Sequence, residues 1–122
     1  MMAGASAELA GELGLPGPEL EPTRTLAAVD AWVASDGPLD KDDAARLGFL
    51  LARLLIEAHG GGMTVIRAPG HGLDGEWAIT GFQRGLAADY HVPFVISAAR
   101  IGIDRSLSAA KWYAECLREG LQ

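Results

Sequence analysis

Three stretches of the chain carry apolar residues at the i, i+3, i+4 spacing of a helix: residues 25–34, 41–59 and 106–119. The middle stretch follows Asp40, a good N-cap, and ends at Gly60. We therefore predict three main helices. For the last helix we expect one inward stripe, formed by Leu107, Ala110, Ala114, Leu117 and Leu121.

The helix at residues 41–59 is apolar on most of its circumference, which is typical of a helix buried on more than one side. Beside the main apolar stripe of this helix, a second apolar stripe on one flank consists of Phe49, Ala52 and Ile56. Gly48 lies one turn before Ala52, so another backbone could approach closely there. Either this is the central helix of the domain or one flank is an interface, and we expect the flank of Phe49, Ala52 and Ile56 to be an interface.

Strand-like patterns occupy the second half of the chain. Residues 63–68 and 76–82 alternate or cluster β-branched and aromatic side chains, and residues 92–99 contain the continuous apolar run VPFVI. The order of elements predicts an α+β fold. We expect a small antiparallel sheet of about three strands with the helices packed mainly on one face.

The first 22 residues differ in composition from the rest. They consist mostly of Ala, Gly, Pro and Glu with a few leucines, which leaves little apolar area to offset the entropy of ordering. We expect residues 1–22 to form a mobile arm and residues 23–122 to form a single globular domain. Removal of residues 1–17 should then leave the melting temperature almost unchanged, unless the leucines of the arm dock on a partner surface.

Composition and charge exclude several classes of protein. The 122-residue chain has a formal net charge of −6, which disfavours nucleic acid and anionic membranes as partners. A single cysteine permits no internal disulfide and no cysteine-based zinc site. No apolar run is long enough to span a bilayer, and the start of the chain lacks the pattern of a secretory signal. We expect a cytoplasmic protein, and the preference for Arg over Lys is typical of a GC-rich bacterial genome.

The stretch RAPGHGLDGEW, residues 67–77, is the first candidate site. Its Asp-Gly pair is a strong hairpin signal, so a turn between two strands explains its glycines. Two alternatives remain open: a recognition loop, and an acid–base site in which His71 works with Asp74 or Glu76. The same three residues could offer mixed ligands to a metal, but no second histidine stands at a fixed spacing, so we expect no metal and no cofactor.

A second candidate site precedes the last predicted helix. Arg100, Arg105 and Ser106 could bind an anion at the helix N-terminus, where free N–H groups point outward. The alternative is an ordinary capped connection, because Asp104 could occupy the same N–H groups. Ser97 and Cys116 lack the local setting of a nucleophile and are expected to be packing residues.

These patterns contain no convincing catalytic constellation. We therefore expect a small binding, regulatory or accessory protein that acts through protein–protein association, as a homo-oligomer or with a partner protein. The alternative is a small cofactor-free enzyme, an isomerase or hydrolase, that uses His71, Asp74 and Glu76.

Overall fold

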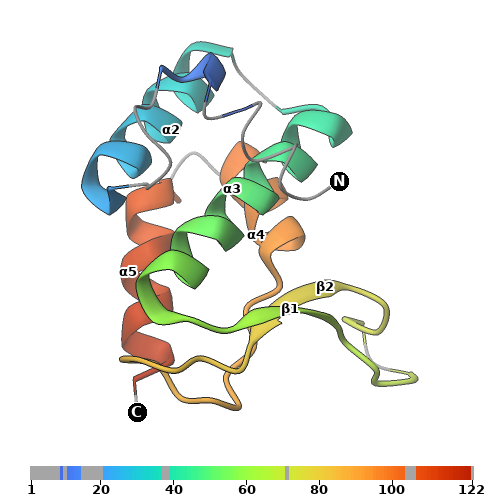
Figure 1. The fold of residues 1–122 in the computed structure, drawn as a ribbon. Helices are drawn as coiled ribbons and strands as arrows, with labels where there is room; N and C mark the ends of the chain where they lie inside the picture. The colour runs from blue at the N-terminus through green and yellow to red at the C-terminus, as the bar shows by residue number, and fades with distance from the viewer. Residues whose placement is uncertain are drawn as a thin grey trace.

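The computed structural model describes residues 9, 11–14, 21–36, 39–70, 72–103 and 107–121. The described part of the chain has an α+β fold, as predicted, with four long helices and a two-stranded antiparallel sheet (Figure 1). The elements, numbered as in Figure 1, are α2 (Pro22–Asp36), α3 (Lys41–His59), β1 (Gly62–Val65), β2 (Trp77–Thr80), α4 (Phe94–Ile103) and α5 (Ala109–Glu119).

Helix α3 is the central helix, and its predicted bounds of 41–59 are confirmed. The carboxylate of Asp40 accepts a hydrogen bond from the Asp43 N–H at 2.7 Å and caps the start. At the other end the Gly60 N–H donates to the Ile56 carbonyl, and Gly60 has a φ of 76° that suits glycine. Its buried residues cover most of the helix circumference: Ala44, Leu47, Gly48, Leu50, Leu51, Ala52, Leu54 and Leu55.

Helices α2 and α5 lie side by side on one flank of α3 (Figure 1). Helix α2 contains the predicted stretch 25–34 but begins earlier, because the Glu21 carboxylate accepts hydrogen bonds from the N–H groups of Thr23 and Arg24. Helix α5 lies within the predicted stretch 106–119, with Ser108 as its N-cap. The inward stripe expected for α5 was wrong: the buried residues of the helix are Ala109, Trp112, Tyr113 and Cys116.

The strand predicted at residues 92–99 was also wrong, because this run forms helix α4. Phe94, Ser97, Ala98 and Ile101 are the buried residues, and their i, i+3, i+4, i+7 spacing is that of one helix face. The Pro93 carbonyl accepts the first helical hydrogen bond from the Ser97 N–H, and the Ser97 hydroxyl donates to the same oxygen. A continuous apolar run does not by itself distinguish a buried strand from a buried helix, and here the helical packing against α3 prevails.

The sheet is therefore smaller than predicted. Strand β2 lies within the predicted stretch 76–82, whereas β1 begins one residue before the predicted stretch 63–68 and ends at Val65. The two strands pair from Gly62 with Thr80 to Val65 with Trp77. Among the described residues, only Val92 adds to them, through one isolated bridge to Ile79. We expected the helices to cover one face of a broader sheet, and they do not. The core lies mainly among the helices, and the hairpin extends from one end of them (Figure 1).

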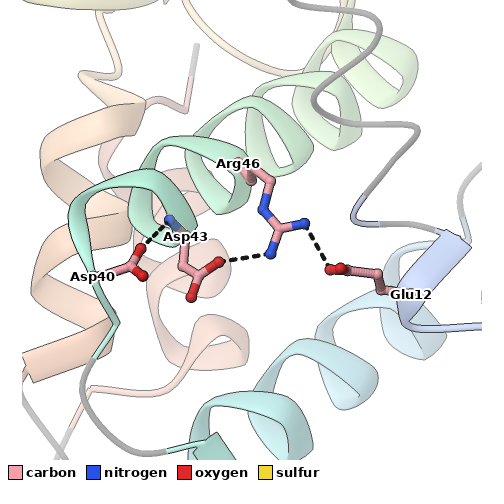
Figure 2. Close-up of polar contacts among 4 residues, drawn as sticks. All are labelled: Glu12, Asp40, Asp43 and Arg46. Carbon is pink, nitrogen blue, oxygen red and sulfur yellow. Dashed lines mark hydrogen bonds and ion pairs between the residues drawn. The ribbon is translucent and has the colours of Figure 1, made fainter.

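Part of the N-terminal segment lies against the helices. Leu9 is fully buried within the hydrophobic core. Glu12 forms an ion pair with Arg46 at 2.7 Å, and Arg46 also binds Asp43 (Figure 2). The hydrogen bond to Asp43, followed by the charge of Glu12, raises the pKa of Arg46 above its ordinary value. These contacts support docking of the N-terminal segment on the helices through Leu9. The mobility of residues 1–22 as a whole stays a prediction.

Candidate functional site: the hairpin of β1 and β2

The hairpin of β1 and β2 continues one pair beyond the strands. The Ile66 N–H donates to the Glu76 carbonyl, and the Gly75 N–H donates to the Ile66 carbonyl. The loop between these pairs contains Gly70 and Gly75, both with positive φ. The turn predicted from the Asp-Gly pair is therefore present, and it directs the loop away from the helices (Figure 1).

The candidate acid–base residues have different positions in this loop. The Asp74 carboxylate accepts a hydrogen bond from the Ala68 N–H at 2.9 Å and so closes the turn, and Asp74 is exposed. Glu76 takes part in the ladder through its backbone. His71 lies outside the described residues, so the predicted combination of the three side chains is not tested. No group of three or more His, Cys, Asp or Glu that could hold a metal occurs among the residues that are described.

Side chains on one face of the hairpin differ sharply in exposure. Met63, Val65, Trp77 and Ile79 share this face, because Met63 pairs with Ile79 and Val65 pairs with Trp77. Ile79, near the helices, is fully buried, whereas Trp77 is 41% exposed. The hairpin thus presents a large aromatic side chain to solvent at the end that extends from the helices.

The outer edge of β1 carries backbone groups that point away from β2. Thr64 and Ile66 belong to the hydrogen-bonded pairs of the ladder, so the alternation of an antiparallel pair turns the N–H and C=O groups of Met63 and Val65 outward. Among the described residues, no backbone hydrogen bond reaches these four groups. In the described part of the chain, β1 therefore has no second strand beside it.

The proposed anion site at the start of α5 is already occupied by a side chain of α2. Asp30 accepts hydrogen bonds from the Ala109 N–H at 2.6 Å and from the Ala110 N–H at 3.4 Å. Ser108 accepts from the Lys111 N–H at 3.1 Å. Arg100 is an exposed residue in the last turn of α4, not in a connection between a strand and a helix. Arg105 and Ser106 lie outside the described residues.

The flank of α3 that we expected to be an interface faces α4 instead. Ala52 is fully buried, and the ring of Phe49 lies 5.3 Å from the ring of Phe94 between centroids. Ile56 is partly buried and packs against the core. Residues 92–99, which we expected to be a strand, thus contact this flank as a helix, and an interface formed by Phe49, Ala52 and Ile56 stays a prediction.

Cys116 has the surroundings of a packing residue. It is buried in α5, and this burial raises the pKa of its thiol to about 12, although the neighbouring Tyr90 hydroxyl offsets part of the rise. Burial likewise raises the pKa of Tyr90. At neutral pH the Cys116 thiol is therefore protonated and a poor nucleophile.

A loop missed by the sequence analysis connects β2 to α4. The His59 carbonyl accepts from the N–H groups of Gln83 and Arg84, and the His59 ring Nδ1 lies 2.9 Å from the Arg84 carbonyl. These contacts attach the loop to the C-terminal end of α3 and so support the base of the hairpin. His91 is exposed, and its ring Nδ1 lies 2.7 Å from the Asp89 carbonyl oxygen.

The exposure of Trp77 and the free edge of β1 were not deduced from the sequence. The alternation in residues 76–82 does place Trp77 and Ile79 on one face, but it does not tell which end of that face lies under the helices. No described helix is both long enough and apolar enough to cross a membrane. Comparison of the chain with known protein families, with curated proteins and with solved structures gives no match.

Proposed function

We propose that this protein acts by binding another polypeptide chain through the hairpin of β1 and β2. The observation that carries the proposal is the exposure of Trp77 beside Val65, one strand away from an unpaired sheet edge. Tryptophan is among the side chains that contribute most to protein interfaces, because it buries a large area and loses little conformational entropy. An exposed edge adds main-chain hydrogen bonds, as in strand addition.

The distribution of charge supports this choice of surface. Residues 1–60 contain ten acidic and four basic side chains, whereas residues 61–122 contain six of each. All of the net negative charge therefore belongs to the half of the chain before the hairpin. The hairpin itself carries few charges, because residues 62–80 contain only Arg67, Asp74 and Glu76 among Asp, Glu, Lys and Arg, so a partner that approaches it meets no strong field of one sign.

Site-specific photocrosslinking in the cell that naturally produces the protein tests the proposal. A photoreactive phenylalanine derivative replaces Trp77 in the full chain, and the matched control carries the same residue at Ala110, which is exposed on α5. We expect a covalent adduct from position 77, none from position 110, and loss of the adduct when Val65→Glu is added. Absence of an adduct at position 77 would contradict the proposal.

Substitution of Trp77 should separate binding from folding. Because Trp77 is 41% exposed, we expect Trp77→Ala to cost about 1 kcal/mol of stability or less, well below the value for a buried aromatic residue. Association measured with the purified partner should nevertheless fall by tenfold or more, as for an interface anchor. A large drop in the melting temperature would instead assign Trp77 to the core.

A further inference from the structure

We propose that the chain bound by the hairpin is a second copy of this protein, whose β1 pairs antiparallel with β1 across a two-fold axis. This inference rests on the proposed function and specifies its partner. The product is a four-stranded sheet in which the order of strands is β2, β1, β1 and β2. Such an interface is isologous, because the same edge of each subunit provides both halves of the contact.

Hydrogen-bonding geometry permits this pairing without a change in the hairpin. The ladder within one subunit extends from Gly62 to Ile66, and its middle residue is Thr64. A two-fold axis at Thr64 places Met63 opposite Val65 of the partner subunit. These are the two residues whose N–H and C=O groups point outward, so each pair exchanges two hydrogen bonds.

The composition of the edge suits self-association. The segment GMTVI contains no charged residue and no proline, which are two of the devices that keep strand edges apart. In the two-fold register Arg67 faces Gly61 of the partner subunit, so no like charges are opposed. Thr64 faces Thr64 of the partner subunit, a favourable cross-strand pair.

The side chains form a continuous row across the new interface. Trp77 lies beside Val65 within one subunit, and Val65 would lie beside Met63 of the partner subunit. Met63 in turn pairs with the buried Ile79. The outer end of one hairpin, with Trp77 and Val65, would thus lie beside the inner end of the other hairpin, with Met63 and Ile79. Because β1 is only four residues long, the dimer should be weak and dependent on concentration.

Charge substitutions at Thr64 test the two-fold pairing. Sedimentation velocity of the full chain should show a monomer–dimer equilibrium. Thr64→Lys and Thr64→Glu should each be monomeric, since like charges oppose one another, and an equimolar mixture of the two should regain the dimer. The controls Ala110→Lys and Ala110→Glu should associate as the wild type does. A wild type that stays monomeric at every concentration would overturn the inference.

A cysteine at the same position gives a test that does not depend on charge. In the proposed register Thr64 lies opposite Thr64 of the partner subunit in a non-hydrogen-bonded pair. The Cα atoms of such a pair are about 4.5 Å apart, a separation that suits a disulfide. Thr64→Cys should therefore form a covalent dimer under mild oxidation faster than Ala110→Cys, and the buried native Cys116 should not react. Equal rates for the two variants would contradict the pairing. If the Trp77 crosslink joins a different protein, self-pairing fails while the proposed function stands, and if no adduct forms, both fail.

Discussion

The glycine at the contact between helices α3 and α4 has much less space around it than the glycines of the hairpin loop. A Cβ atom on Gly48 would lie 3.1 Å from the Val95 Cα and 3.2 Å from the Phe94 carbonyl oxygen. A Cβ atom on Gly70, Gly72 or Gly75 would meet nothing within 4 Å. The close approach predicted at Gly48 is therefore confirmed, whereas the glycines of the loop serve the backbone conformation alone.

This difference indicates where stability and binding can be changed separately. The helices are packed so closely that added atoms have no room, and their side chains determine whether the fold forms. The hairpin loop is open to solvent, so its side chains can change without a large effect on the core. Four substitutions or conditions test this contrast, and they are ordered by the size of the expected effect.

The largest effect should come from Gly48→Val. The new side chain would have to displace the backbone of α4, which cannot yield as a flexible side chain would, and we expect a loss of about 3 kcal/mol in the free energy of unfolding. The matched control is Gly72→Val, which adds the same atoms to an exposed position with open space. Urea denaturation of both variants is the measurement, and equal losses would remove the contrast.

Leu9→Ala should have the second-largest effect. Leu9 is fully buried, and removal of its side chain should cost about 2 kcal/mol, near the lower limit for a core leucine because a segment near the chain end can adjust. Glu12→Ala, which removes an exposed partner of Arg46, should cost less than about 1 kcal/mol. Thermal unfolding compares the two variants. An unchanged melting temperature for Leu9→Ala would support the mobile arm expected from composition.

Alkaline pH should weaken the helical part of the molecule. Burial raises the pKa of Cys116 from 9.0 to about 12, so between these values the unfolded chain loses this proton while the folded chain retains it. Stability is therefore complete below pH 9 and falls as the pH rises, by at most about 1.4 kcal/mol over the first pH unit above 9 for one proton. Urea midpoints measured from pH 8 to pH 10 should decline, and Cys116→Ala should decline less steeply. Parallel curves would show that the thiol is not responsible.

Gly75→Val should have the smallest effect of the four. Gly75 has a φ of 86°, which a β-branched residue adopts only with strain, and the expected cost is about 1 kcal/mol. The cause is the backbone conformation, since open space surrounds the position. Gly72→Val again serves as the control, because Gly72 has no positive φ. If the two valine variants are equally stable, the loop tolerates strain that we attribute to Gly75.

Local signals in the sequence predicted the elements whose ends are determined locally. The bounds of α3 followed from Asp40 and Gly60, and the two strands of the hairpin followed from alternation around an Asp-Gly turn. Helix α4 was missed because a continuous apolar run lacks the polar positions that would show its period. The stripe of α5 was misplaced because small and aliphatic residues were preferred to Trp112 and Tyr113, whose large aromatic side chains are buried together with Ala109 and Cys116.

The candidate site depended on contacts between distant parts of the chain. Asp30 and Ala109 are 79 positions apart, so no local pattern indicated that a carboxylate of α2 occupies the N-terminus of α5. The order of the strands was not predicted either: Val92 bridges to Ile79 of β2, so β1 is the strand without a second neighbour among the described residues. The turn at Asp74 and Gly75, by contrast, was predicted correctly because its chemistry lies within a few residues.

The hydrogen bonds from Ala109 and Ala110 to Asp30 also bear on the order in which the protein folds. During synthesis α2 leaves the ribosome long before the helix against which it packs has been made. Contacts between such distant segments form slowly, because a long loop must first be closed. Helix α3 and the hairpin that follows it can form from neighbouring residues, whereas α2 must wait with part of its apolar face uncovered. For α2, the first of the long helices in sequence, docking should therefore be among the last steps of folding.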